Sequence, residues 1–244
     1  QNMPRGSTFP VRKAIVSRFN NGFILEGDYR QLEFRVAGFL SKDKQLYRDV
    51  ENNVDVHQYT ADTMGVERQE AKAHTFKPLY GGVLGTPKEM RYYEAFKHKY
   101  WQVTNWHDKL QKEAVDTKKI KLPSGREYAF PYARYTQYGN VTNSTAIKNY
   151  PVQGFATADL LPLALVNLYA MMKKKNMKSV ICNTVHDSII LDVHPEEKIQ
   201  CIDCLRNAMM SIKDECKSRY NVDYDMPVDI ELKIGDNWLE TNEI

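Results

Sequence analysis

The fold is decided by the stretch Phe23-Ile24-Leu25-Glu26-Gly27-Asp28-Tyr29-Arg30-Gln31-Leu32-Glu33-Phe34-Arg35. Its apolar opening predicts a buried strand, and Gly27 allows the backbone to approach a neighbouring element closely. A helix up to about Leu46 is expected next, because apolar residues recur at helical spacing: Leu32, Val36, Phe39 and Leu40. Asp28 stands where strand gives way to helix. A carboxylate there either caps the helix or binds a metal ion.

Composition is that of an ordinary globular protein. The 244 residues are 42% hydrophobic and 27% charged, and the length fits one or two domains. No apolar run approaches the roughly 20 residues that cross a bilayer, and no signal segment is recognisable. An intracellular protein without a membrane partner is expected. The net charge of +3 permits a nucleic-acid partner without requiring one.

The cysteines do not form a disulfide framework or a zinc site. There are four of them: Cys182, Cys201, Cys204 and Cys216. The pair at 201 and 204 has C-x-x-C spacing, but no second pair of cysteines or histidines accompanies it. These residues are therefore predicted to be ordinary surface or core cysteines.

Residues 67–82 predict a helix with a chemically mixed face. Four side chains recur every four residues, two cations followed by two aromatics: Arg68, Lys72, Phe76 and Tyr80. Such a face either binds phosphates beside a sugar or base, or packs its aromatics while the cations extend to solvent. Pro78 predicts a bend, and Gly81-Gly82 ends the helix.

The remaining pattern predicts further helices and two hairpins. Helical segments are expected at 88–117, 141–180 and 195–219, a hairpin at 119–130 and a last strand at 228–234. Asn149 and Gln153 are amides that either satisfy backbone groups or read base edges. His57, near a helix start, is a surface residue or a ligand-binding one.

A second acid lies at the tip of a hairpin. Two apolar strands within Ser179–Val193 flank the short segment Val185-His186-Asp187-Ser188. If the strand before Asp28 neighbours this hairpin, Asp28 and Asp187 can share divalent cations. Two hard cations bridged by acids suit in-line attack at a phosphate. With a cationic helix between them in sequence, the acids predict phosphoryl transfer with a triphosphate substrate.

These motifs together resemble family A DNA polymerases, the bacterial DNA polymerase I type. Asp28 to Arg35 resembles the first palm motif of that family, and Val185-His186-Asp187 resembles the second. The fingers helix and a primer-contacting element are matched by Arg68, Lys72, Phe76, Tyr80 and Gly81, and by Asn149, Gln153 and Gly154. The resemblance covers essentially the whole chain.

The resemblance implies an α+β fold, with an antiparallel palm sheet, packed helices and an inserted, mostly helical fingers subdomain. Residues 1–50 and 149–244 are expected to form the palm, and residues 51–148 the fingers. Counterparts of the thumb and proofreading exonuclease domains are absent from this sequence. The chain is therefore expected to be a fragment or one piece of a split polymerase, with an N-terminal thumb and exonuclease portion in cis or as a separate chain.

The resemblance also implies a role for each matched residue. Asp28, Asp187 and the carbonyl of Tyr29 would hold two Mg²⁺ ions. Lys72 would donate a proton to the leaving pyrophosphate, and Glu33 would exclude a 2′-hydroxyl. The other expected contacts with the nucleotide come from Gln31, His57, Arg68, Phe76 and Tyr80. Expected contacts with DNA come from Tyr80, Asn149, Gln153 and His186.

The predicted function is template-directed DNA synthesis from dNTPs on primer–template DNA, for replication or repair, with pyrophosphate release. One alternative is a single-subunit RNA polymerase, against which Glu33 argues, and another is a non-catalytic nucleic-acid-binding fragment, against which the two acids argue. Departures from the bacterial pattern suggest a divergent, phage-like member: Arg30, Lys77-Pro78, Thr145 and Ser188. The expected location is the cytoplasm of a bacterium or phage-infected cell, or an organelle.

Overall fold

The computed structural model describes residues 9–82 and 84–244. The chain forms two compact units. The sheet unit consists of Gln1–Leu32, Ala156–Asp223 and Val228–Ile244, and the helical unit of Glu33–Phe155 and Tyr224–Pro227.

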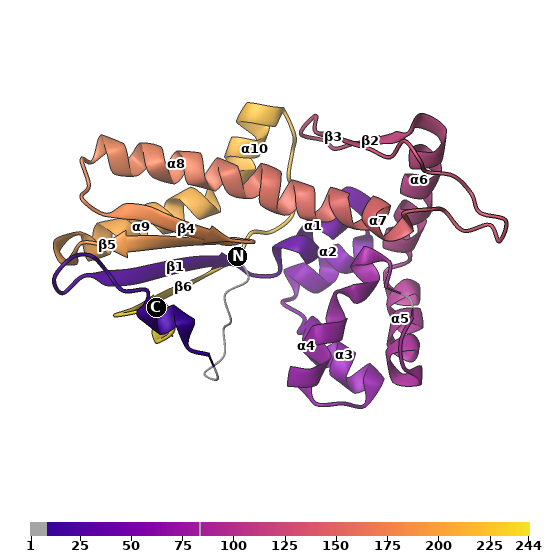
Figure 1. The fold of residues 1–244 in the computed structure, drawn as a ribbon, viewed down its shortest axis with the longest axis horizontal. Coiled ribbons are helices and arrows are strands. Elements are labelled where there is room, and N and C mark those ends of the chain that lie inside the picture. Colours follow the sequence, from indigo (N-terminus) through magenta and orange to yellow (C-terminus); the bar gives the residue numbers. More distant parts are fainter. Residues whose placement is uncertain (1–8, 83) are drawn as a thin grey trace. The chain divides into compact units, whose positions relative to one another are not determined.

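The sheet unit is built on a five-stranded antiparallel sheet in the order β4-β5-β1-β6-β7 (Figure 1). Its strands are β1 (Phe23–Tyr29), β4 (Val180–Val185), β5 (Ser188–Val193), β6 (Ile230–Gly235) and β7 (Thr241–Glu243). The short 3-10 helix η1 (Val11–Ala14) precedes β1. Strand β1 is central because its apolar run is buried, with Leu25 fully inaccessible. The predicted α+β class with an antiparallel sheet is confirmed.

Helices cover one face of this sheet (Figure 1). They are α8 (Leu161–Lys174), α9 (Lys198–Met210) and α10 (Ile212–Tyr220), with the 3-10 turn η4 (Pro195–Glu197) before α9. A methyl group added to Gly27 would lie 2.6 Å from the sulfur of Met209, so the predicted close approach at this glycine is to α9. The expected single helix over 195–219 is wrong. It breaks at Ser211, whose hydroxyl donates to the carbonyl of Ala208 at 2.9 Å.

The helix expected up to Leu46 is also two helices, α1 (Leu32–Ser41) and α2 (Lys44–Glu51). Between them Lys42 adopts φ +55°, and the side chain of Asp43 accepts the backbone N–H of Leu46 at 2.9 Å. Asp28 lies inside β1, four residues before α1 begins, and so it is not the cap of that helix. The capping interpretation of Asp28 is therefore wrong.

The rest of the helical unit follows the sequence pattern with two interruptions. It contains α3 (Val56–Met64), α4 (Arg68–Thr75), η2 (Lys77–Tyr80), α5 (Pro87–Lys99), α6 (Trp101–Thr117), β2 (Lys119–Lys121), β3 (Glu127–Ala129) and α7 (Ser144–Gln153). The helix expected over 88–117 breaks at Tyr100, whose hydroxyl donates to buried Asp49 at 2.6 Å. The predicted bend at Pro78 is confirmed, because the α-helix ends at Thr75 and a 3-10 turn continues to Gly81 at φ +76°.

A run of helical residues extends over Ser144–Lys174, where α7 passes through the π-helical turn Gly154–Leu160 into α8. Within the described residues, this run is long and apolar enough to cross a membrane. Half of its most apolar window is buried inside the protein. The sequence predicts a helical segment at 141–180 but no unbroken apolar run of the length that crosses a bilayer, and this helix meets the length and composition test only as a whole. Core helices of soluble proteins have the same composition, so the run is weak grounds for a membrane span.

The four cysteines are free, and three of them are buried: Cys201, Cys204 and Cys216. The first two lie in α9 as part of the packed core of the sheet unit. Burial raises the pKa of Cys201 to about 11. The interpretation of the C-x-x-C pair as ordinary cysteines agrees with this burial.

Candidate active site

The two acids predicted to act together lie at the same end of neighbouring strands. Asp28 in β1 is paired with Ser188, the first residue of β5, and Asp187 directly precedes Ser188 in the turn from β4. The backbone N–H of Tyr29 donates to the carbonyl of Asp187 at 3.3 Å. Both acids are half-buried. Antiparallel pairing thus brings together two carboxylates that are far apart in sequence.

The turns beside these acids have unusual backbone conformations. His186, the other residue of the β4–β5 turn, and Gln31, between β1 and α1, both have φ +54°. Residues other than glycine rarely adopt positive φ, and such outliers gather at functional sites. Ser188 is fully buried, and its hydroxyl donates to the carbonyl of Val185 at 3.0 Å. The side chain at this position closes the turn.

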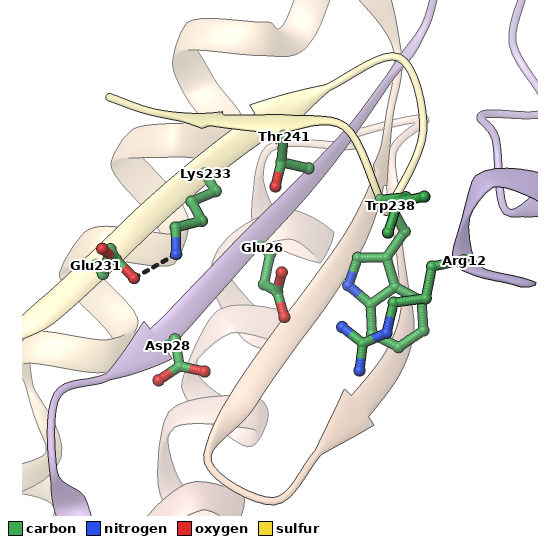
Figure 2. Close-up of a pocket in the computed structure, with 8 residues that line it drawn as sticks. Arg12, Glu26, Asp28, Glu231, Lys233, Trp238 and Thr241 are labelled. Carbon is green, nitrogen blue, oxygen red and sulfur yellow. Dashed lines mark ion pairs between the residues drawn. The ribbon is translucent and has the colours of Figure 1, made fainter. Parts of the chain in front are cut away.

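A polar row continues from Asp28 along the face of the sheet opposite the helices. In the strand register Asp28 is paired with Glu231 of β6, and Glu26 is paired with Lys233. Side chains two residues apart on a strand share a face, so all four lie together, as Figure 2 shows. They line a cavity of about 250 Å³. Lys233 forms an ion pair with Glu231 at 2.6 Å, which offsets one of its three carboxylates.

The end of this cavity away from Asp28 is closed by a stacked pair. The guanidinium of Arg12 lies 4.0 Å from the ring centroid of Trp238, and both residues are buried (Figure 2). Stacking of a guanidinium on an indole is a favourable cation–π contact. The pair anchors η1 against the segment that follows β6.

The donors at the strand ends fit Mg²⁺. Two carboxylates, Asp28 and Asp187, stand beside the backbone of Tyr29, so that the available donors are hard oxygens. Among residues 9–82 and 84–244, no group of three or more His, Cys, Asp or Glu side chains could hold a metal ion by itself. Mg²⁺ is usually bound through one or two carboxylates, with water and substrate phosphates completing its shell. This donor set is therefore suited to a metal that shares a phosphate substrate.

The helical unit carries the predicted phosphate-binding residues. Arg68 and Lys72 are exposed one turn apart on α4. The Nε of Arg68 donates to Asp55 at 2.8 Å, and the other oxygen of Asp55 accepts the backbone N–H groups of His57 and Gln58 at 3.0 Å each. The bond from Arg68 holds the pKa of Asp55 below its usual range. Asp55 thus caps α3 and fixes the Arg68 side chain.

His57 and Phe76 pack against each other beside this pair. Their ring centroids are 5.4 Å apart, edge to face, and the ring of Phe76 also contacts that of Phe34 at 5.9 Å. His57 Nδ1 is hydrogen-bonded to Thr75 Oγ1 at 2.9 Å. Burial lowers the pKa of His57, with the charge of Arg68 acting in the same direction. The imidazole is therefore neutral at pH 7.

The remaining predicted site residues of the helical unit differ in their burial and in their hydrogen bonds. Glu33 and Tyr80 are half-buried, and burial raises the pKa of Glu33. The resemblance to family A polymerases also implies a hydrogen bond between the Tyr80 hydroxyl and the Glu33 carboxylate, and this bond is not formed in the part of the chain that the structure describes. Asn149 has a buried Oδ1 with no hydrogen-bond partner among the described residues, and Gln153 is exposed at the end of α7. A buried acceptor of this kind is rare and is consistent with a ligand contact.

The match to a family model decides the family. The model described as DNA polymerase family A matches residues 1–240.

The chain belongs to DNA polymerase family A.

Curated relatives in this family are DNA polymerases I. The chain is 30% identical over 253 aligned positions to DNA polymerase I of Caldicellulosiruptor bescii, covering 95% of the chain and 28% of the relative. It is 29% identical to the thermostable DNA polymerase I of Thermus aquaticus, covering 98% of the chain and 30% of the relative. The chain therefore spans less than a third of the length of these relatives.

A solved structure shares the family A fold. It is the POL domain of Pol1 from M. smegmatis in complex with DNA primer–template and dNTP. The TM-score is 0.81 at 21% identity, and the match covers 98% of this chain and 44% of the other. The arrangement of the antiparallel sheet and its helices is thus a fold already seen in the family.

Sequence reasoning missed three acids of this family A chain: Glu26, Asp55 and Glu231. Glu26 could have been found, because it lies two residues before Asp28 on the same strand face. Asp55 has the signature of a helix cap, although its bond to Arg68 is visible only in three dimensions. Glu231 had no sequence signal, because the register between β1 and β6 places it beside Asp28.

Proposed function

We propose that the chain is the palm and fingers portion of a template-directed DNA polymerase. It would add deoxynucleotides to a primer 3′-hydroxyl and release pyrophosphate, in replication or repair. Family membership supports this reaction. The observation that carries it is the pairing of Asp28 with Ser188, which brings two acids to one strand end. The sheet unit would correspond to most of the palm and the helical unit to the fingers.

In this proposal Asp28, Asp187 and the carbonyl of Tyr29 hold two Mg²⁺ ions. When bound, Mg²⁺ supplies Lewis acidity and neutralises charge on the reacting phosphate. The bond between Tyr29 and Asp187 keeps the strand end and the hairpin turn in fixed register, so that the carboxylates are held before substrate arrives. Glu26 and Glu231 add negative potential on the same face, which favours cations there.

The exposed face of α4 would bind the triphosphate. Arg68 and Lys72 present a guanidinium and an ammonium one turn apart, and both are strong donors to phosphate oxygens. Lys72 has no ion-pair partner within the described residues, so its proton is available for the leaving pyrophosphate. Asp55 orients Arg68, and its backbone cap positions His57 at the start of α3.

The nucleoside would be selected by residues next to that face. Phe76, supported by Phe34 and His57, offers a ring to the incoming sugar. Glu33 would occupy the space of a 2′-hydroxyl and so exclude ribonucleotides. Tyr80 would pack at the nascent base pair, and Gln31 would contact the nucleotide from the turn after β1.

The primer terminus would be contacted by Asn149, Gln153 and His186. The unpartnered Oδ1 of Asn149 supports a hydrogen bond to a group outside the chain. Gln153 lies next to Gly154, where an added methyl group would lie 2.0 Å from the hydroxyl of Tyr128. This close approach keeps the end of α7 against the β2–β3 hairpin and fixes the position of Gln153.

Further contacts with the primer–template duplex would come from a thumb domain. The thumb and a proofreading exonuclease domain would be present in cis or as a separate chain. This part of the proposal is supported by the small share of the relatives that the chain spans. The cytoplasm of a bacterium or phage-infected cell is the proposed location.

A single-nucleotide addition assay tests the function. The chain, in excess over a labelled primer–template, is mixed with one dNTP or the matching rNTP, with Mg²⁺ or with chelator. Mg²⁺-dependent extension by the templated dNTP supports the proposal. Extension without regard to template, or preference for the rNTP, contradicts it.

A further inference from the structure

A loop far along the helical unit exposes three tyrosines. Residues 131–143, which we call the tyrosine loop, join β3 to α7 and extend away from the rest of the unit (Figure 1). Tyr132, Tyr135 and Tyr138 are 81%, 54% and 79% exposed. Large aromatic side chains that are this exposed and this close together usually mark a binding surface.

The exposure is built into an ordered loop. Backbone bonds join Thr142 N–H to the carbonyl of Arg134 at 3.0 Å and Thr136 N–H to that of Asn140 at 2.7 Å. Two apolar side chains of the loop, Ala133 and Val141, are buried and join a cluster with Phe130 and with Leu110 and Ile147 of the neighbouring helices. The loop buries its small and aliphatic side chains and leaves the tyrosines outside.

The segment of sequence that contains this loop carries a net positive charge. Residues 117–158 carry a single acid, Glu127, and six cations: Lys118, Lys119, Lys121, Arg126, Arg134 and Lys148. This segment has a net charge of +5, so the rest of the chain, whose total is +3, carries −2. Glu127 is itself paired with Lys119 at 3.1 Å. The charge of this segment, of which Lys118 and Arg134 lie at the loop itself, therefore favours an anionic partner.

A shallow cavity lies where charge and aromatics meet. It has a volume of about 510 Å³, and its lining includes Lys118, Tyr132, Arg134 and Asn143. The ammonium of Lys118 donates to the carbonyl of Ala133 at 2.6 Å, which fixes this cation at the base of the loop. A guanidinium, an amide and an aromatic ring remain on the surface of the cavity.

We propose that the tyrosine loop is a stacking platform for single-stranded DNA. Bases stack on exposed aromatic rings without regard to sequence, and flanking cations bind the phosphates between them. Duplex fits this surface less well, because its bases are already stacked and its edges would face the rings. The identity of the strand rests on the proposed function: in a polymerase it is the unpaired template ahead of the primer terminus.

Binding of a labelled dT 12-mer, measured by fluorescence anisotropy at several salt concentrations, tests the platform. Replacing Tyr132 and Tyr138 by Ala should weaken binding about tenfold for each ring that stacks on a base. Replacement by Phe should retain binding, because the ring remains. Arg134→Ala should make the salt slope shallower by about 0.7. Tyr169→Ala is the matched control, since Tyr169 is 61% exposed on α8 in the other unit.

Three outcomes would overturn the platform. They are unchanged affinity in the Tyr132 and Tyr138 Ala variants, equal losses in the Phe and Ala variants, or competition by duplex as strong as by single strand. Unchanged affinity would leave a protein partner as the occupant of the loop. The binding assay contains no nucleotide, and so it separates this inference from the proposed function. Asp187→Asn, which should abolish nucleotide addition, should bind the 12-mer as the unaltered chain does.

Discussion

The backbone N–H of Tyr29 donates a hydrogen bond to the carbonyl of Asp187 at 3.3 Å. This contact joins the last residue of the central strand to the turn between β4 and β5. Asp28 is the residue before the donor, and Asp187 is the acceptor residue itself. One backbone hydrogen bond therefore fixes the positions of both carboxylates. A metal site made in this way depends on strand register more than on any side-chain contact.

Asn at either position tests that site. Asp28→Asn and Asp187→Asn keep the side-chain shape and remove one negative charge each, so the strand pairing should be retained. Nucleotide addition should fall by orders of magnitude while primer–template affinity changes little, because the charge acts mainly in the transition state. Single-turnover extension and anisotropy measure the two quantities. Asp203→Asn, at an exposed carboxylate of α9, is the control. Near-normal extension by Asp187→Asn would exclude the site.

The hydrogen bond from Arg68 to Asp55 should increase the affinity of the chain for dNTP. Asp55→Asn keeps a good helix cap for α3 but loses the charged partner of Arg68. Because both side chains are about half exposed, the loss is about 0.5–1 kcal/mol, a two- to fivefold rise in KM for dNTP with kcat unchanged. Steady-state kinetics with Asp62→Asn as control measure this. A fall in Tm with no change in KM would mean that Asp55 serves only the helix.

Glu33 and Phe76 should determine which nucleotide sugars the chain accepts. Glu33→Ala opens space beside the incoming sugar, and ribonucleotide incorporation should rise relative to deoxynucleotide. Phe76→Tyr places a hydroxyl where a missing 3′-hydroxyl leaves a gap, so dideoxynucleotide use should rise. The ratio of kcat/KM values for each nucleotide pair is the measurement. If both variants keep the ratios of the unaltered chain, neither residue contacts the sugar as proposed.

The acids of the site could be predicted because each ends an apolar run. Asp28 lies near the end of the strand that opens with Phe23, and Asp187 lies in a segment too short to be anything but a turn. Their proximity could not be derived from those runs, since any two strands of a sheet can be neighbours. The resemblance to a known family supplied it. The neighbouring acid Glu231 stayed hidden, because alternation along β6 does not reveal which residue of β1 it faces.

The sequence pattern also did not predict where three of the expected helices are interrupted. The break before Asp43 has a local signal, because Asp is a preferred cap, and only the apolar spacing hid it. The breaks at Tyr100 and Ser211 lack glycine and proline. The hydroxyl of Tyr100 donates to buried Asp49, and the hydroxyl of Ser211 donates to the carbonyl of Ala208. The spacing of apolar residues encodes neither of these hydrogen bonds.

A buried histidine should make stability depend on pH. His107 of α6 is 6% exposed, and its Nε2 has no hydrogen-bond partner among the described residues. Burial lowers its pKa to about 3, with the charge of Lys148 in the same direction and a bond to the backbone of Leu79 opposing it. The imidazole therefore stays neutral in the folded chain at pH values where it is protonated in the unfolded chain.

The sign follows from proton uptake by the unfolded state. The stabilisation associated with neutral His107 is complete above about pH 6.5 and is lost as pH falls toward 3, at up to about 1.4 kcal/mol per pH unit. His107→Phe cannot titrate at this position. Between pH 7 and pH 5 its free energy of unfolding should therefore fall by about 2 kcal/mol less than that of the unaltered chain. Urea unfolding at both pH values gives the difference, in which the other titrating groups cancel. His98→Gln, at an exposed histidine of α5, should retain the full pH dependence. Parallel curves for the unaltered chain and His107→Phe would mean that His107 is protonated in the fold, with a polar partner for Nε2.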